Sequence, residues 1–416
     1  MVQQAAQRVE VWVAIETADI RAGVLFATRR GRTESCTFAY EPSYLATSGA
    51  YAIDPSLPLR TGSYQTPVGQ AVFGAMSDCA PDRWGRTLVK RSEAAAARAN
   101  GRPARQLGEI DFLLGVRDDL RQGALRFRLV EGGFLASADT GVPALTDLPE
   151  LLDLAARAEQ SSADLPDLQR LVRVGSSLGG ARPKAHVRGD DGRVAIAKFP
   201  SASTDTWNVM AWEKVALDLA RSAGIEVPHS RLLDLAGRSV LVVDRFDRHR
   251  DGRRVGYASA MTMLEARDGD QRSYLDIAAV VENVSVSAAA ELAELWRRMV
   301  FSILISNTDD HLRNHGFLHV HDDVWRLAPA FDLNPNPEPG PKHLSTAVSN
   351  DDDRAAVATA LDIAPLFRLR IPESNRILND VRAAVRRWRD VARAVGLSWQ
   401  ECTDMAWAFE AAEAMP

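Results

Sequence analysis

Residues 168–200 read LQRLVRVGSSLGGARPKAHVRGDDGRVAIAKFP. The small-residue loop GSSLGGARP (175–183) and the turn GDDG (189–192) separate three apolar stretches, so the pattern predicts strands at LQRLVRV, KAHVR and RVAIAKF. Because glycine lacks a Cβ, the backbone N–H groups of such a loop can approach a phosphate closely. The pattern GxxxxGK[ST] is absent, so this is not a Walker A loop. Two interpretations of the loop remain: a phosphate-binding site and an ordinary turn.

The last of these strands ends in Lys198. A glycine-rich loop, a turn and a strand ending in lysine are the order found in protein-kinase-like nucleotide sites. A lysine beside apolar neighbours needs an anion, either a phosphate or a carboxylate. The helix predicted to begin near Thr204 or Asp205 and to end at Gly224 offers Glu213 at the edge of its apolar stripe. We expect a Lys198–Glu213 ion pair; the alternative is an unrelated strand-end lysine and a surface glutamate.

Outside this stretch the chain changes character along its length. Residues 8 to about 130 alternate like half-buried strands with short helices, 137–148 form a polar connector, and two more strands precede Asp251. After Asp251 the apolar spacing is helical, apart from one polar hairpin. The predicted fold class is α+β, a protein-kinase-like two-lobe fold. We expect a small α+β amino-terminal subdomain (1–136), a mixed β N-lobe (137–248) and an all-helical C-lobe (249–416).

A second group of polar residues lies in the helical half, at TDDHLRN (308–314) and FDL (331–333). Phosphoryl transfer needs an aspartate that orients the attacking hydroxyl and further oxygen donors that hold Mg²⁺. In protein kinases the base aspartate and the metal-binding asparagine are five residues apart. Asp309 and Asn314 have that spacing, which favours Asp309 over Asp310, and the hairpin that follows leads to Asp332.

The same region supports a rival interpretation. Four of the eight histidines lie there and, with neighbouring aspartates, are candidates for a transition-metal site of a hydrolase: His311, His315, His319 and His321. Two of the four lie beside the expected turn at Asp322-Asp323, where solvent reaches them, so ordinary surface histidines are the simpler interpretation. Only His311 is kept in the candidate site.

The segment VDRFDR (243–248) follows an apolar strand where the strand-rich half gives way to the helical half. Backbone groups exposed at such a junction can pair with an adenine edge, although a charged loop alone is the commoner meaning of this pattern. Its place between Lys198 and Asp309 in chain order favours the first interpretation.

Composition sets outer limits on function. The chain has 416 residues, enough for two or three domains, and its 50 basic and 55 acidic residues give a net charge of −5. A protein with this balance does not bind nucleic acid through its overall charge. The cysteines, Cys36, Cys79 and Cys402, have no CxxC spacing, and no apolar run approaches the roughly 20 residues of a membrane span. We therefore expect a cytoplasmic protein that makes no contact with a membrane.

Taken together, these motifs resemble the HipA-like serine/threonine kinases, the toxins of bacterial toxin–antitoxin modules. SSLGGARPKAHV resembles the family's Gly-rich loop, AIAKFP its nucleotide lysine, VVDRFDR its hinge, TDDHLRN its catalytic loop and LAPAFDL its metal-binding segment. FAYEPSYLA, SLPLRTG, VFGAMSDCAPDRWGR and LLGVRDDLRQGALRF are similar to the small domain that precedes the kinase core. Five motifs in the right order make the resemblance specific, and it covers nearly the whole chain.

The resemblance assigns roles by position. Asp309 would be the catalytic base, assisted by Lys198, His311 and Asn314, while Asn314 and Asp332 would hold Mg²⁺. Ser177, or the adjacent Ser176, would be the autophosphorylated loop serine. The residues expected to contact ATP are Gly179, Gly180, Ala181, Arg182, Pro183, Lys184, Lys198, Asp244, Arg245, Phe246, His311, Asn314 and Asp332.

Two features depart from the family pattern. Asp310 stands where glycine is common, and Arg182-Pro183 differs from some members. Neither change removes a group that the chemistry needs.

The implied activity is Mg-ATP-dependent phosphorylation of a translation-related protein, such as an aminoacyl-tRNA synthetase. The implied partner is a small helix-turn-helix antitoxin, through which alone the chain would reach DNA. Two alternatives stay open: a catalytically weak or inactive nucleotide-binding co-repressor, and a small-molecule kinase. The loop that follows Asp332 is where we expect a protein acceptor to dock.

Overall fold

The computed structural model describes residues 6–31, 33–129, 132–135, 141–175, 180, 182–189 and 191–413. The chain divides into two compact units. The first contains Met1–Ser203, Asp247–Ala258 and Leu318–Asp323; the second contains Thr204–Phe246, Ser259–Phe317 and Val324–Pro416. Sheets and many helices are both present, so the predicted α+β class is confirmed. The division into two kinase lobes and the boundaries at 136 and 248 stay predictions.

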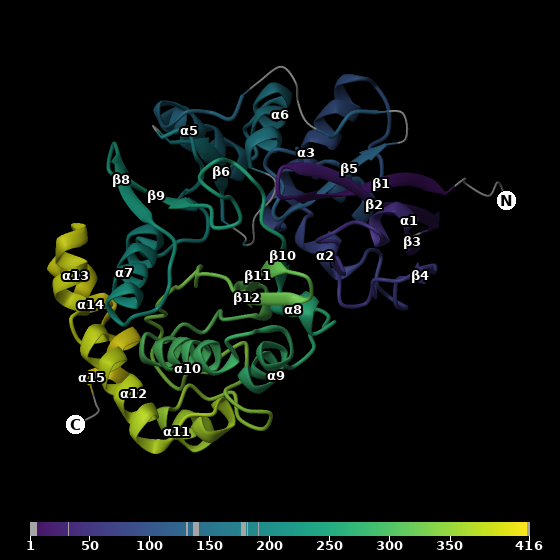
Figure 1. Cartoon of the computed structure of the whole chain (residues 1–416). Helices are drawn as coiled ribbons and strands as arrows, with labels where there is room; N and C mark the ends of the chain where they lie inside the picture. The colour runs from purple at the N-terminus through teal and green to yellow at the C-terminus, as the bar shows by residue number, and fades with distance from the viewer. Residues whose placement is uncertain are drawn as a thin grey trace. The chain divides into compact units, whose positions relative to one another are not determined.

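An antiparallel sheet forms the core of the amino-terminal part of the first unit (Figure 1). Its strand order is β4-β3-β2-β1-β5, and each pair runs antiparallel. Alternate residues of β1, Val9, Val11 and Val13, are completely buried, as the period of two in VEVWVAI predicts. The strands are β1 (Gln7–Ile15), β2 (Ala18–Arg30), β3 (Thr33–Tyr40), β4 (Tyr64–Gln65) and β5 (Leu125–Leu129).

Helices of four to 17 residues complete this part of the first unit. They are α1 (Pro42–Leu45), α2 (Gly74–Asp78), α3 (Arg83–Ala99), α4 (Glu109–Leu114), the 3₁₀ turn η1 (Leu145–Asp147), α5 (Leu148–Glu159) and α6 (Leu165–Val174). Helix α3 packs against α6. The Asp82 side chain caps α3 by accepting a hydrogen bond from the Gly85 N–H at 2.7 Å.

The strand expected at LQRLVRV is wrong, because these residues lie in helix α6. Asp164 caps the helix through the Asp167 N–H, and Pro166 lies in its first turn. The buried residues Leu168, Leu171 and Val174 are spaced by three, as on one helix face. The other two strands of the stretch are confirmed as the antiparallel hairpin of β6 (Lys184–Arg188) and β7 (Val194–Lys198).

The second unit begins with helix α7 (Val209–Ser222), which carries Glu213. The predicted start at Thr204 or Asp205 is wrong by several residues, because Asn208 is the residue that caps the helix, accepting from the Ala211 N–H at 3.2 Å. Helix α7 packs against the antiparallel hairpin of β8 (Ser230–Leu235) and β9 (Arg238–Asp244), whose two strands the sequence predicted.

The carboxyl-terminal region is mostly helical, but the all-helical prediction for 249–416 is wrong. Strands β10 (Tyr257–Ser259), β11 (Gly316–His321) and β12 (Val324–Leu327) interrupt the helices, and the last two flank Asp322-Asp323 as the hairpin pattern predicted. Among the described residues, no helix combines the length and apolar character needed to cross a bilayer. The helices are α8 (Ala260–Met263), α9 (Tyr274–Val284), α10 (Ala288–Leu304), η2 (Leu312–Asn314), α11 (Val357–Ile363), η3 (Ala364–Phe367), α12 (Ile371–Val385), α13 (Trp388–Val395), α14 (Trp399–Asp404), η4 (Ala406–Phe409) and α15 (Glu410–Glu413).

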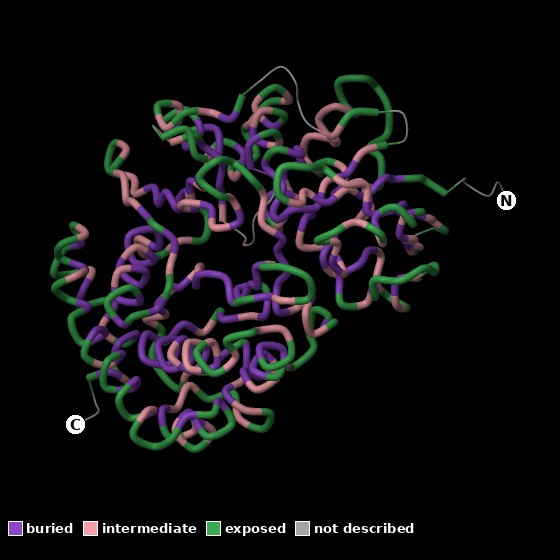
Figure 2. The backbone as a smooth tube through the Cα atoms, viewed as in Figure 1, coloured by how far each residue is buried: buried purple, intermediate pink, exposed green. Residues whose placement is uncertain are grey.

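An aromatic cluster anchors α7 to the carboxyl-terminal helices. The Trp388 ring stacks on Phe409 with centroids 4.4 Å apart, and Trp212 of α7 lies 6.0 Å from Trp388. All three side chains are buried, and Figure 2 shows that buried segments continue through α10. Trp212 is one residue before Glu213, so this cluster fixes the helix that carries the candidate ion-pair glutamate.

We predict that Trp388→Ala lowers the free energy of unfolding by about 3–5 kcal/mol, because it removes a buried indole and leaves a cavity. Urea denaturation followed by circular dichroism measures the change. Trp399→Ala is the matched control, since this tryptophan is 67% exposed. Equal stability of Trp388→Ala and wild type would contradict the packing described for α7.

Candidate active site

The candidate catalytic loop lies between α10 and β11 in the second unit. Asp309 is exposed at its start, and Asn314 is largely buried at its end. The Asn314 Nδ2 donates a hydrogen bond to the Asp309 carbonyl oxygen at 2.9 Å. The Asn314 N–H donates to the His311 carbonyl oxygen at 2.8 Å, which closes the short turn η2. The structure therefore brings the predicted base and the predicted metal-binding asparagine to one compact turn.

The segment of Asp332 lies directly against the residues that precede this loop. The Asn334 N–H donates to Asn307 Oδ1 at 3.3 Å, and the Asn336 Nδ2 donates to Thr308 Oγ1 at 2.9 Å. Asp332 itself has a left-handed backbone with φ of +57°, unusual for a residue with a side chain. Asp332 is thus held at the same end of the second unit as Asp309.

A third segment, Leu344–Ala347, also bonds to the loop. The Ser345 hydroxyl donates to the Thr308 carbonyl oxygen at 2.8 Å, and the Thr346 N–H donates to the Asp310 carbonyl oxygen at 3.0 Å. Sequence reasoning missed these contacts and those of Asn334 and Asn336. The alternating NPNP after FDL was the available signal, since proline restricts the backbone between two polar side chains.

The two neighbouring aspartates of the loop have opposite environments. Asp310 is 3% exposed, whereas Asp309 is exposed. Tyr274 donates its hydroxyl hydrogen to Asp310 Oδ2, and His315 Nε2 lies 2.9 Å from Oδ1. Burial by itself raises the pKa of Asp310, but His315 and the hydrogen bond from Tyr274 outweigh it and hold that pKa below the ordinary value. Burial and the Asp310 charge raise the pKa of Tyr274 well above its ordinary range, so its hydroxyl remains a donor.

The predicted hinge residues lie at the end of β9. The Phe246 ring packs at 5.4 Å from Phe331, the residue before Asp332, and Arg245 is buried. The chain passes from the second unit to the first between Phe246 and Asp247. The ring contact links the hinge segment to the Asp332 segment within the second unit.

The first unit contains the two lysines expected to bind phosphates. Lys184 and Lys198 lie opposite each other across the β6–β7 hairpin. Lys184 is 4% exposed, and its Nζ is 2.5 Å from Asp82 Oδ2. Burial raises the pKa of the Asp82 carboxyl, and the Lys184 ammonium and the Gly85 N–H act against that rise. The Asp82 charge thus neutralises one of two cations that share a face of the hairpin.

The structure describes some of the remaining predicted residues and not others. Gly180 has φ of +115°, and a Cβ added there would lie 3.0 Å from Lys184 Nζ, so the close approach of the loop to this ammonium depends on glycine. Glu213 is 2% exposed on α7, and its pairing with Lys198 stays a prediction. Four of the predicted positions lie outside the described residues: Ser176, Ser177, Gly179 and Ala181.

The histidines do not gather into one site. His315 contacts Asp310, whereas His319 belongs to the first unit and stacks on Tyr51 with centroids 3.7 Å apart. Within the described part of the chain, no group of three or more His, Cys, Asp or Glu side chains is arranged to hold a metal ion. The transition-metal hydrolase alternative therefore has no support among these residues.

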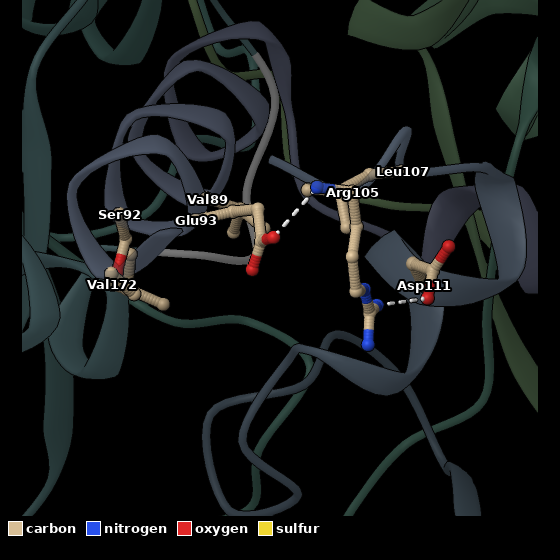
Figure 3. A pocket seen from close by; sticks show the side chains of 8 residues that line it. Val89, Ser92, Glu93, Arg105, Leu107, Asp111 and Val172 are labelled. Carbon is tan, nitrogen blue, oxygen red and sulfur yellow. Dashed lines mark hydrogen bonds and ion pairs between the residues drawn. The ribbon is translucent and has the colours of Figure 1, made fainter. Parts of the chain in front are cut away.

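A cavity of about 250 Å³ lies elsewhere in the first unit (Figure 3). Its polar groups pair with one another: the Arg105 N–H donates to Glu93 Oε1 at 2.8 Å, and Arg105 Nη2 donates to Asp111 Oδ1 at 2.8 Å. None of the predicted site residues that the structure describes lines it. The lining residues are Val89, Ser92, Glu93, Ala96, Arg105, Leu107, Asp111 and Val172.

Comparison with known proteins identifies the family of the chain. The family model of the HipA-like C-terminal domain matches residues 176–399, and that of the HipA N-terminal domain matches residues 13–110. The first model alone covers more than half of the chain. The chain belongs to the HipA-like family and carries both of its domains.

Individual relatives are distant. The chain is 31% identical over 152 residues to "Putative kinase Y4dM" of Sinorhizobium fredii, and 26% identical over 143 residues to "Putative kinase" of Haemophilus influenzae. These matches cover 33% and 30% of this chain, and only 36% and 42% of the relatives.

One solved structure is similar over nearly the whole chain. It is that of the Shewanella oneidensis toxin–antitoxin system HipA, HipB and its operator DNA complex, with a TM-score of 0.65 and 14% identity. The similarity covers 98% of this chain and 96% of that one, which establishes a shared fold.

We predict that Asp82→Ala lowers the free energy of unfolding by about 3–5 kcal/mol, because it leaves the Lys184 ammonium buried without its partner. Urea denaturation at pH 7 measures the effect. Asp191→Ala is the control, since Asp191 pairs with Arg193 on the surface at 2.6 Å, and its urea midpoint should stay close to that of wild type. Matching midpoints for Asp82→Ala and wild type would show that the buried pair contributes little.

Proposed function

We propose that the chain is an Mg-ATP-dependent serine/threonine protein kinase that acts as the toxin of a toxin–antitoxin module. The observation that carries the proposal is the hydrogen-bonded cluster of Asp309, Asn314 and the Asp332 segment. Kinase chemistry needs little covalent work from the protein and depends on positioning and charge stabilisation. Three oxygen-bearing side chains on one bonded cluster are suited to that task.

Each residue of the cluster has a distinct role in this proposal. Asp309, exposed at the start of the loop, accepts the proton of the acceptor hydroxyl and orients that hydroxyl toward the γ-phosphate. The Asn314 amide has its Nδ2 committed to the Asp309 carbonyl oxygen, which leaves Oδ1 to serve with the Asp332 carboxylate as an oxygen donor. These donors suit Mg²⁺, which when bound neutralises charge on the β- and γ-phosphates. His311 Nδ1 is buried and makes no hydrogen bond to any residue that the structure describes, which is consistent with a group awaiting a ligand.

The nucleotide contacts in the proposal come from the glycine-rich segment and the hinge. Lys198 and Lys184 supply positive charge toward phosphates, Lys184 being held by Asp82. Backbone groups of Asp244–Phe246 pair with the adenine. Ser177 is the proposed autophosphorylation site, with Ser176 as the neighbouring alternative.

The proposed partners follow from the family and from the net charge. The similar Shewanella oneidensis structure is a complex of HipA with HipB and operator DNA. We propose that this chain likewise binds a helix-turn-helix antitoxin and reaches DNA through it, because its own net charge is −5. The proposed acceptor is a translation-related protein such as an aminoacyl-tRNA synthetase, and the proposed location is the cytoplasm.

We predict that wild-type protein with Mg-ATP transfers labelled phosphate to serine or threonine, on itself or on a protein in a lysate. Asp309→Asn should lower this transfer by about 10³-fold or more, since it removes the base without changing shape. Phosphoamino-acid analysis of the labelled bands measures both effects.

The control is Asp353→Asn, because Asp353 is exposed and pairs only with His343 on the surface among the contacts described for its side chain. Its transfer rate should equal that of wild type. Label that is absent from wild type, or equal in Asp309→Asn, overturns the kinase proposal. Label that appears on a metabolite instead of a protein favours a small-molecule kinase. Induced wild type should also arrest growth, whereas Asp309→Asn should not; arrest by both would favour an inactive co-repressor.

A separate prediction concerns the loop serines. Ser177→Ala should abolish labelling of the chain itself while transfer to an external protein continues, and Ser176→Ala should keep self-labelling. Peptide mapping by mass spectrometry checks the site. A phosphate on Ser176 alone would shift the assignment by one residue.

A further inference from the structure

The strongest unexplained feature of the second unit is the buried carboxylate of Asp310. Its neighbour Asp309 is exposed, so the chain carries two aspartates of which only one can meet a substrate. Taking an ionised carboxylate out of water is costly unless hydrogen bonds and charges compensate. Because burial of this carboxylate is costly, we expect Asp310 to have a specific role in the candidate loop.

Both oxygens of Asp310 are held. Tyr274 donates to Oδ2, and His315 Nε2 lies 2.9 Å from Oδ1. Tyr274 is completely buried and His315 is 6% exposed, and the two rings meet edge to face at 5.2 Å. Tyr274 is the first residue of α9, so the carboxylate is tied to that helix of the second unit.

The backbone of Asp310 is held as well. Its carbonyl oxygen accepts from the Thr346 N–H at 3.0 Å, and the Tyr274 N–H donates to the Ala347 carbonyl oxygen at 2.9 Å. The first turn of α9, the segment at 346–347 and the candidate loop therefore meet at this one aspartate.

The positions of Asp310 and His315 along the chain relate their contact to the proposed catalytic residues. Asp310 directly follows Asp309, and His315 directly follows Asn314. The Asp310–His315 contact therefore closes the loop at the two residues adjacent to the proposed base and the proposed metal-binding asparagine. The contact acts together with the Asn314 Nδ2 hydrogen bond to the Asp309 carbonyl oxygen, and its loss should change the separation of Asp309 and Asn314.

We propose that Asp310 is a positioning residue for phosphoryl transfer, which through Tyr274 and His315 sets the separation and orientation of Asp309 and Asn314. This inference rests on the proposed kinase function.

Steady-state kinetics on the full chain test the proposal. Asp310→Ala and His315→Leu should each lower kcat by about 100-fold, since a displacement of about 1 Å at the reacting groups has that effect. The KM for ATP should stay within about threefold, because no nucleotide contact is removed. His315→Gln should restore most of kcat, since its amide nitrogen takes the place of Nε2. The double variant Asp310→Ala/His315→Leu should be no slower than Asp310→Ala, because the two residues act as one unit.

Asp353→Ala is the matched control. It breaks an Asp–His pair of similar length, 2.8 Å, on the exposed surface of the second unit, and kcat should not change. Tyr274→Phe decides the question if Asp310→Ala does not fold, since it removes one hydroxyl and keeps the ring; kcat should fall about tenfold. Unchanged kcat in Tyr274→Phe and Asp310→Ala, or a loss in His315→Leu that His315→Gln does not restore, overturns the positioning role.

Hydrogen exchange separates this inference from the proposed function. If wild type transfers no phosphate, the kinase proposal fails. The amide exchange of residues 309–315 still tests whether the contacts of Asp310 with Tyr274 and His315 hold the loop, an arrangement that we call the clamp. These amides should exchange at least about tenfold faster in Tyr274→Phe, while those of α7 stay unchanged, because a weakened clamp opens locally. Identical exchange in wild type and Tyr274→Phe overturns the inference even if the kinase activity is real.

Discussion

The shape of the candidate catalytic loop depends above all on the burial of one carboxylate, that of Asp310. An ionised group at 3% exposure is stable only where hydrogen bonds and nearby charge compensate its burial; here the Tyr274 hydroxyl donates to one oxygen, and His315 Nε2 lies 2.9 Å from the other. Since the aspartate lies within the loop and the histidine at its end, the requirement to satisfy one charge also determines the shape of the loop. Asp309 is left exposed as a consequence, and Asn314 is turned inward toward the Asp309 carbonyl oxygen.

The first unit shows the same principle with the opposite sign of charge. Lys184 is buried at the carboxyl end of the glycine-rich segment, and Asp82 of the amino-terminal domain compensates it. Asp82 also caps helix α3, so one side chain links the start of a helix to the start of strand β6. The family match places a HipA N-terminal domain in front of the HipA-like C-terminal domain, and this pair joins residues from the two. The small domain thus has a structural connection to the segment expected to bind phosphates.

Much of this fold could be predicted from local patterns. The alternation in VEVWVAI correctly predicts a strand, and the three- and four-residue spacing after Asp251 correctly predicts helices. Each element buries one face, so its apolar residues recur with the period of a strand or of a helix. The strand prediction for LQRLVRV is wrong because a short apolar run fits a strand or a helix equally well. The residues that indicate a helix, Asp164 and Pro166, lie before the run.

The candidate site was only partly predictable. The five-residue spacing of Asp309 and Asn314 reflects one local turn, and local turns can be inferred from sequence. Tyr274 lies 36 residues before Asp310, and Thr346 lies as far after it, so only the tertiary fold brings them to the loop. The resemblance marks Asp310 only as a departure from the family pattern, since a sequence does not reveal whether an acidic side chain points to solvent or to a buried tyrosine.

The most direct test of the central claim, that this site transfers phosphate from ATP to a protein hydroxyl, is a mass balance in one sample. Phosphorus-31 NMR follows ATP, ADP and free phosphate, while mass spectrometry counts phosphoserine and phosphothreonine. We predict one phosphorylated hydroxyl for each ADP formed, and neither product in Asp309→Asn. ADP formed with free phosphate and no phosphoprotein, or no consumption of ATP by wild type in the presence of acceptor proteins, would contradict the account.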